Sequence, residues 1–207
     1  MKEKKFFTTK NVTYLSVLLA LVIIFQLLAS FMKIGTTSFC LVLVPIVLGG
    51  IILGARGGAF LGGAFGIIVI VSALIGLDPF TLYMLGDQPF LAVMLCLVKG
   101  IAAGVVPALL YKAIAKKSER IAVFVAAAAA PIVNTGIFIL GALMMSGVIM
   151  DAFTAFDVDV SGMSPFYVVI VLCVGINFFV ELMLNLVLAP AAYKVVKITS
   201  NRRNTGA

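Results

Sequence analysis

The sequence predicts an all-α membrane protein: a bundle of six transmembrane helices with both termini in the cytoplasm. Composition predicts the class. Of the 207 residues, 63% are hydrophobic and only 11% are charged, whereas roughly a quarter of the residues of soluble domains are charged. The mean hydropathy is +1.26. Long uncharged stretches take up most of the chain, so a soluble catalytic or nucleotide-binding domain of ordinary size has no room beside them.

The helices follow from the length and order of these stretches. A helix rises about 1.5 Å per residue and has to cross a hydrocarbon core of about 30 Å. The expected spans cover residues 15–32, 39–55, 57–77, 89–111, 121–150 and 165–193. The second is at the short limit, Arg56 after it predicts a tight hairpin with the third, and the fifth is expected to end near Gly147. The first is longer than the apolar part of a signal peptide and is expected to be retained.

The distribution of basic residues sets the orientation. Every Lys and Arg except Lys33 and Lys99 falls in the N-terminal tail, at Arg56, in the 112–120 loop or in the C-terminal tail. The positive-inside rule therefore places both termini in the cytoplasm and the 148–164 loop outside. Residues 1–10 and 195–207 are expected to be cytoplasmic tails, and 11–194 to be the transmembrane domain. This rule accounts for the net charge of +7, so no nucleic-acid partner is predicted.

The residue types argue against catalysis. The chain has no histidine, which excludes Ser-His and Cys-His nucleophiles and His-based zinc or haem sites. Its three cysteines, Cys40, Cys96 and Cys173, lie in apolar runs without a CxxC spacing and are expected to be small buried hydrophobic residues. We therefore predict no catalytic residues, no metal site and no cofactor.

Glycines recur at four-residue spacing in the middle of the chain. They are Gly50, Gly54, Gly58, Gly62 and Gly66, followed by Gly100 and Gly104. In lipid, strips of small residues allow helix backbones to approach closely. The spacing predicts packing within the bundle. The pair Ser16 and Ala20 forms a single small notch on an otherwise bulky first span, which leaves docking of a partner helix open there.

Polar residues inside the spans are candidates for function because each costs a few kcal/mol in lipid unless it is paired. Lys99 lies in the fourth span, Asn134 in the fifth, and Asn177, Glu181 and Asn185 follow each other at four-residue spacing on one face of the sixth. Lys99, Asn134 and Glu181 fall at similar depth. Two interpretations remain open: a salt bridge between Lys99 and Glu181 that only fixes helix packing, or a pocket for a small polar ligand.

The pattern as a whole resembles the substrate-binding membrane subunit, or S component, of energy-coupling factor (ECF) vitamin transporters. The resemblance extends from about Thr13 to Tyr193. It rests on the six-span size, the notch at Ser16 and Ala20, and four segments. These segments are Ser38 to Gly50 (SFCLVLVPIVLGG), Leu97 to Gly100 (LVKG), Pro131 to Gly136 (PIVNTG) and Asn177 to Glu181 (NFFVE).

The resemblance implies a non-enzymatic subunit of a bacterial cell membrane that captures a vitamin from outside. The site would be built by the loop after the first span and by spans four to six, with Lys99, Asn134, Asn177 and Glu181 as its binding residues. Such subunits dock on a membrane coupling protein with two cytoplasmic ATPases and topple to release substrate inward. The family notch is usually Ala-xxx-Ala, from which Ser16 departs slightly. The absence of a Walker sequence agrees with this division of labour.

Two other classes compete with this interpretation. A self-sufficient secondary transporter or channel would use Lys99 and Glu181 as a proton relay, but no inverted repeat relates the two halves of the chain. A membrane enzyme such as a lipid-modifying transferase would need a reactive constellation that the sequence lacks. The vitamin is not specified by the sequence, although the charge of Lys99 favours an anionic substrate.

Overall fold

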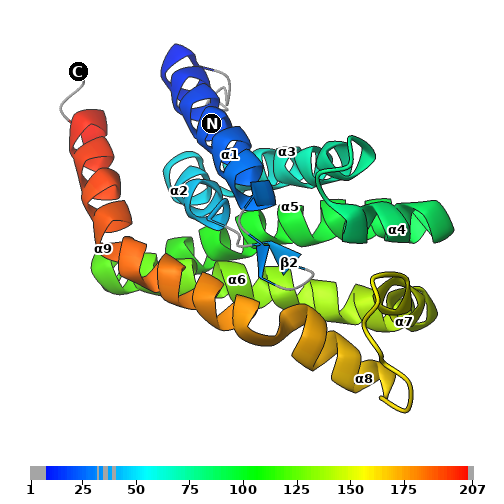
Figure 1. Ribbon diagram of the computed structural model, residues 1–207. Coiled ribbons are helices and arrows are strands. Elements are labelled where there is room, and N and C mark those ends of the chain that lie inside the picture. The colour runs from blue at the N-terminus through cyan, green and yellow to red at the C-terminus, as the bar shows by residue number, and fades with distance from the viewer. Residues whose placement is uncertain (1–7, 32, 35–36, 39–40, 205–207) are drawn as a thin grey trace.

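The structure is a computed structural model and describes residues 8–31, 33–34, 37–38 and 41–204. Apart from one two-residue antiparallel pair of strands, in which Lys33 pairs with Ser38, the secondary structure of this part is helical (Figure 1). In chain order the elements are α1 (Thr9–Phe31), β1 (Lys33–Ile34), β2 (Thr37–Ser38), α2 (Leu43–Leu53), α3 (Ala55–Leu74), α4 (Pro79–Asp87), α5 (Pro89–Ile114), α6 (Glu119–Met144), α7 (Ser146–Ala155), α8 (Pro165–Tyr167), the π-helix η1 (Val168–Val174) and α9 (Gly175–Asn204). The all-helical fold class is therefore confirmed.

The predicted number of six spans is not confirmed. Within the described residues, five segments are long and apolar enough to cross a membrane: Thr9–Ala29, Ala55–Leu74, Pro89–Ile114, Glu119–Met144 and Pro165–Ser200. In the described part of the second expected span, 41–55, the helix α2 has 11 residues and ends before Gly54. At about 1.5 Å per residue, α2 reaches roughly half the thickness of a hydrocarbon core. Apolar composition alone overestimated its helical length.

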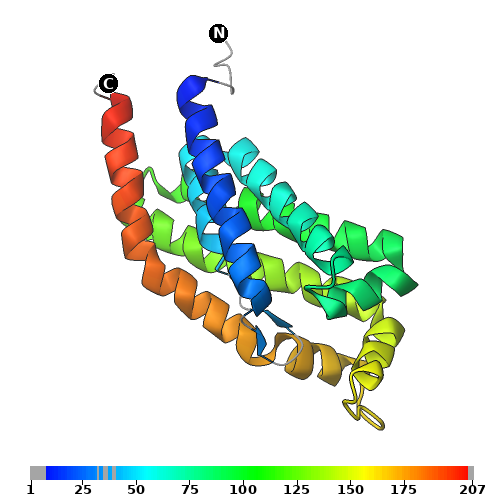
Figure 2. The ribbon, with the colours of Figure 1, turned by 45° about the horizontal axis from the view of Figure 1, so that its top comes forward.

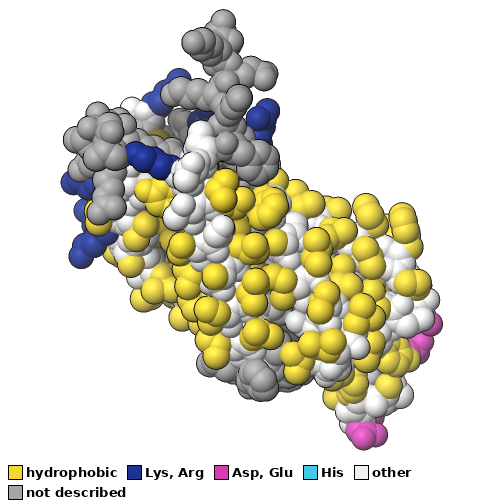
Figure 3. All heavy atoms as spheres, turned by 90° about the horizontal axis from the view of Figure 1, so that it is seen from above, with side chains coloured by type: hydrophobic (Ala, Val, Ile, Leu, Met, Phe, Trp, Pro, Cys, Tyr) yellow, Lys and Arg dark blue, Asp and Glu magenta, His cyan; other side chains and the backbone are white. Residues whose placement is uncertain are grey.

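Basic and acidic side chains gather at opposite ends of the molecule. Figure 3 shows a side covered by apolar side chains, with Lys and Arg gathered at one end and Asp and Glu at the opposite end. The beginning of α1 and the end of α9 lie at the same end of the bundle (Figures 1 and 2). This arrangement fits a membrane protein with both ends on one side. Which side is cytoplasmic stays a prediction.

The hairpin between α2 and α3 turns at Gly54, and the prediction that it turns at Arg56 was wrong. Gly54 has φ 79° and ψ −177°, a conformation that favours glycine because a Cβ would be strained there. Arg56 belongs to the first turn of α3. The turn is thus made by the glycine, two residues before the charge.

The glycine spacing packs α3 against α5, as predicted. A Cβ on Gly58 would overlap the carbonyl oxygen of Gly104, and one on Gly62 would overlap that of Gly100. A Cβ on Gly66 would lie 2.6 Å from the carbonyl oxygen of Cys96. The two backbones therefore cross in direct contact, with no side chain between them. Gly54, at the turn, is the member of the series that does not pack in this way.

The predicted outer loops contain short helices. α4 begins after Asp78, whose side chain accepts a hydrogen bond from the main-chain N–H of Thr81 at 3.2 Å. α7 occupies the start of the predicted 148–164 loop. Phe80 of α4 packs edge-to-face on Phe153 of α7, with ring centroids 6.0 Å apart. Burial of these apolar residues favours helices where Gly, Pro and Asp had predicted loops.

The final span is helical but irregular. α8 continues into the π-helix η1, and Gly175, with φ 28° and ψ −128°, separates η1 from α9. α9 then continues past the predicted boundary at Tyr193 to Asn204, with Pro190 inside it. Figures 1 and 2 show α9 bending between its orange and red parts. Proline accounts for such a bend because it removes a backbone hydrogen bond.

Candidate functional site

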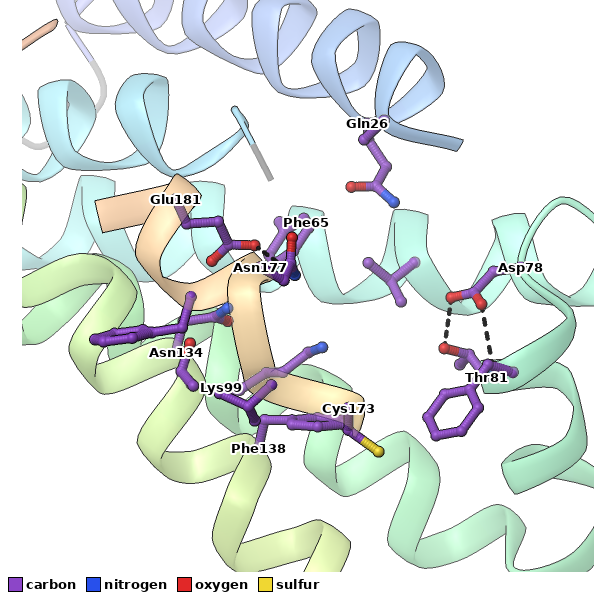
Figure 4. A pocket seen from close by; sticks show the side chains of 16 residues that line it. Gln26, Phe65, Asp78, Thr81, Lys99, Asn134, Phe138, Cys173, Asn177 and Glu181 are labelled. Carbon is purple, nitrogen blue, oxygen red and sulfur yellow. Dashed lines mark hydrogen bonds between the residues drawn. The ribbon is translucent and has the colours of Figure 1, made fainter. Parts of the chain in front are cut away.

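A cavity of about 110 Å³ lies between the helices. Residues of α1, α3, α4, α5, α6, η1 and α9 line it, so it is formed where the two halves of the chain meet (Figure 4). Its lining combines four aromatic side chains with polar and charged ones. The aromatic residues are Phe65, Phe80, Phe138 and Phe178, and the polar ones are Gln26, Asp78, Thr81, Lys99, Asn134, Thr135, Asn177 and Glu181.

The four residues predicted to share one interior pocket all line this cavity. Lys99 comes from α5, Asn134 from α6, and Asn177 and Glu181 from α9. The structure thus brings together side chains that are up to 82 positions apart, from 99 to 181, in the sequence. Asn185, on the same face of the final span in the sequence prediction, is not among the residues that line the cavity.

Lys99 is half-buried and points in among the other lining side chains (Figure 4). Its ammonium nitrogen lies 5.4 Å from the centroid of the Phe138 ring, within the range of a cation–π interaction. Among the described residues the structure records no ion pair between Lys99 and Glu181. The packing salt bridge considered from the sequence is therefore not the arrangement adopted.

Glu181 is deeply buried, with 3% of its surface exposed. The side-chain amide of Asn177, one turn earlier, donates a hydrogen bond to its Oε1 at 3.4 Å. The side-chain amide of Asn185, one turn later, donates instead to the main-chain carbonyl of Glu181 at 2.8 Å. The two asparagines therefore have different roles: Asn177 faces the cavity beside the carboxylate, whereas Asn185 stabilises the helix.

Asn134 is 8% exposed, and its Oδ1 is buried without a hydrogen-bond partner among the described residues. Leaving a buried acceptor unsatisfied costs about 1–3 kcal/mol. Asn134 lies one turn after Pro131, which is accommodated inside a continuous α6. Folds retain such groups where function requires them, which makes this oxygen the strongest single sign of a ligand.

Sequence reasoning missed several lining residues. Gln26 is 7% exposed and lies on the buried face of α1. It was detectable as the one amide in the first apolar run, but only charges and the later asparagines were weighed. Asp78 and Thr81 lie between the expected spans 57–77 and 89–111, where α4 was not predicted. Nothing in the spacing of the four phenylalanines distinguishes them from ordinary core residues.

The cysteine prediction is confirmed where it can be examined. Cys96 and Cys173 are free and buried, and Cys173 also lines the cavity. Cys40 lies outside the described residues. Much of the loop after the first span, expected to contribute to the site, lies outside them as well.

Ser16 and Ala20 lie on the exposed side of α1, while Leu15, Leu18 and Val22 of the same helix are buried in the core. The notch therefore faces away from α2 and α3, on which α1 packs. Neither residue is near the cavity.

A cavity lined by polar side chains between long apolar helices is the usual form of a site for a small polar solute in a membrane protein. The sequence model of one family, described as "ECF transporter, substrate-specific component", matches residues 10–193. The chain belongs to this family, whose members are transporter subunits and not enzymes. The search of curated proteins returned no match.

Proposed function

We propose that this chain is the substrate-capture subunit of an ECF-type importer in the cell membrane of a bacterium. It binds a water-soluble vitamin or related small molecule from outside and delivers it inward with an ATPase-driven partner complex. The cavity carries this proposal: it places Lys99, Asn134, Asn177 and Glu181 together inside the membrane-spanning bundle of a chain that belongs to this family.

The cost of these groups supports a binding role. Each polar side chain at membrane depth is unfavourable by a few kcal/mol, and packing alone would favour apolar residues in its place. A ligand that forms hydrogen bonds or ion pairs with these side chains gains binding free energy, because those interactions are not made in the empty protein. We therefore propose that Lys99, Asn134, Asn177 and Glu181 bind the substrate.

The energy source is proposed to be a partner. The sequence has no phosphate-binding loop of the Walker type, so two cytoplasmic ATPases would hydrolyse the nucleotide and a membrane coupling subunit would join them to this chain. The Ser16–Ala20 notch is the proposed docking point. Both residues are exposed and small, which lets a partner helix approach the α1 backbone closely.

Substitution of the notch tests this division of labour. Ser16→Trp or Ala20→Trp should abolish uptake in cells that contain the partner complex, while ligand binding by the purified subunit stays within about twofold. Val17→Trp, on the exposed side of the same helix but outside the notch, is the matched control. Parallel loss of binding would show that the notch serves internal packing.

Reconstitution separates this proposal from a secondary transporter. The purified chain alone in liposomes should bind substrate without sustained transport, and addition of the coupling subunit and ATPases with ATP should restore it. Sustained transport by the chain alone, abolished by Lys99→Met or Glu181→Gln, would favour the proton-relay mechanism instead.

A further inference from the structure

We propose that the substrate carries an anionic group that binds Lys99 and, close to it, an N–H or O–H donor that binds Asn134 Oδ1. This inference rests on the proposed function and goes beyond it by fixing the functional groups of the substrate. It excludes neutral and cationic compounds that lack a carboxylate, phosphate or sulfonate.

Two carboxylates line the same cavity as Lys99, those of Asp78 and Glu181. Asp78 accepts the main-chain N–H of Thr81 through Oδ1 and the Thr81 hydroxyl through Oδ2. Glu181 accepts the side-chain amide N–H of Asn177. Among the described residues, neither carboxylate forms an ion pair with Lys99.

Lys99 is the cation among the described residues that line the cavity. The group recorded in contact with its ammonium is the face of the Phe138 ring, 5.4 Å away, which attracts a cation less strongly than an anion does. An ammonium in a half-buried wall attracts an anion more strongly than in water because the local dielectric constant is lower. It repels a cationic ligand for the same reason. The geometry therefore favours an anionic group at Lys99.

Asn134 supplies the acceptor for the second group. Its Oδ1 lies inside a residue that is more than nine-tenths buried, and no described residue donates to it. Asn134 and Lys99 line the same cavity of about 110 Å³ (Figure 4). A small ligand whose anion is held at Lys99 therefore occupies the cavity that Asn134 also lines. An N–H or O–H at that place satisfies the acceptor, whereas a methyl group would leave it unsatisfied.

The cavity is small and partly open. Its volume of about 110 Å³ is of the order of an apolar cavity that takes up benzene, about 150 Å³. The rings of Phe65 and Phe138 provide apolar walls. A compact polar group with a ring or short chain fits it, and the rest of a larger substrate can extend through the opening.

The experiment uses the full chain in lipid nanodiscs and the low-molecular-mass fraction of a yeast extract as the probe. After washing, compounds retained by the protein are released by denaturation and identified by mass spectrometry. The variants are Lys99→Met, which removes the charge, and Lys99→Arg, which keeps it. Lys112→Met, in the last turn of α5 and outside the cavity lining, is the matched control. A thermal melt of each variant verifies folding.

We expect the wild type and Lys112→Met to retain a compound with a carboxylate, phosphate or sulfonate and a neighbouring N–H or O–H. Lys99→Met should lose at least tenfold in retention, and Lys99→Arg should keep most of it. The primary amide of the retained acid, titrated calorimetrically against the wild type, should bind at least tenfold more weakly. This second measurement decides the question even if Lys99→Met fails to fold.

Two outcomes overturn the inference while leaving the proposed function intact. One is retention of a neutral or cationic compound, and the other is equal affinity for the acid and its amide. Retention of nothing above the level of a protein-free nanodisc would overturn the proposed function itself. The two failures are therefore distinguishable.

Discussion

The crossing of α3 over α5 and the cavity between α5, α6 and α9 represent opposite ways to join membrane helices. At the crossing, glycines bring two backbones into contact, and a single added methyl group has no space. At the cavity, polar side chains hold the helices apart around a volume of about 110 Å³. Dispersion contacts between close backbones stabilise the first region, whereas unsatisfied polarity makes the second depend on what binds there. Helix α5 belongs to both.

The largest effect is expected at the crossing. Gly62→Ala should destabilise the protein by about 2–3 kcal/mol because the new Cβ overlaps the carbonyl oxygen of Gly100 and the backbones must separate. Gly63→Ala is the matched control, since its Cβ would lie 3.6 Å from Ile101 in ordinary contact. It should change stability by less than about 1 kcal/mol. Circular-dichroism melts in detergent measure both, and equal melting temperatures would contradict the close crossing.

Asn134→Ala tests the contrast between the cavity and the glycine crossing, because it should lower ligand affinity without lowering the stability of the fold. We expect affinity for the retained substrate to fall about tenfold, equivalent to about 1.4 kcal/mol, with little change in melting temperature, because Oδ1 has no described partner to lose. Asn185→Ala is the reciprocal control. It removes a hydrogen bond to the Glu181 main chain, so it should lower stability and leave affinity unchanged. The reverse pattern would mean that Asn134 is structural.

Gly175→Ala tests whether the break in the final span shapes the cavity. A Cβ at Gly175 meets no described atom within 4 Å, but its φ of 28° strains any other residue. We expect a loss of about 1 kcal/mol in stability and a weaker site, because Val174 and Asn177 beside it line the cavity. Gly147→Ala, also in open space but without positive φ, should be neutral. Unchanged binding in Gly175→Ala would separate the break from the site.

The smallest effect is expected for coupling between Lys99 and Glu181. A double-mutant cycle with Lys99→Met and Glu181→Gln in the ligand-free protein should give a coupling free energy below about 0.5 kcal/mol, since no ion pair joins them in the described structure. Chemical unfolding of the four proteins measures it. A coupling free energy of 3 kcal/mol or more, which is about the cost of breaking a buried pair, would support the interpretation that Lys99 and Glu181 form a salt bridge that fixes helix packing.

The sequence predicted correctly those features whose residue types are restricted by the lipid environment. Glycine at four-residue spacing predicted close packing within the bundle, because small residues are the main means of close helix approach in lipid, and the structure shows that α3 and α5 are the helices it joins. Lys99, Asn134, Asn177 and Glu181 stood out because each interrupts an apolar run, and all four line one cavity. In both cases the surroundings restrict the explanations for a residue type, so the pattern alone is informative.

Features that depend on local backbone geometry escaped prediction. Three such features occur in continuous apolar sequence: the short helix α2, the turn at Gly54 and the π-helix η1. Hydropathy does not distinguish one helical geometry from another in such sequence. α4 and α7 were assigned to loops because their flanking Gly, Pro and Asp residues were weighed above the burial of Phe80 and Phe153. Gln26 was overlooked because one amide in a long span is a weak signal.

Lys99 and Gly100 are consecutive residues, but substitutions should be tolerated at 99 and not at 100. The Lys99 side chain enters the cavity, whereas Gly100 abuts the carbonyl oxygen of Gly62. In a laboratory selection for uptake of unfamiliar compounds, accepted codons should diversify at 99 and stay fixed at 100. Adaptation to new substrates can thus proceed on one face of α5 while the other face keeps the scaffold constant.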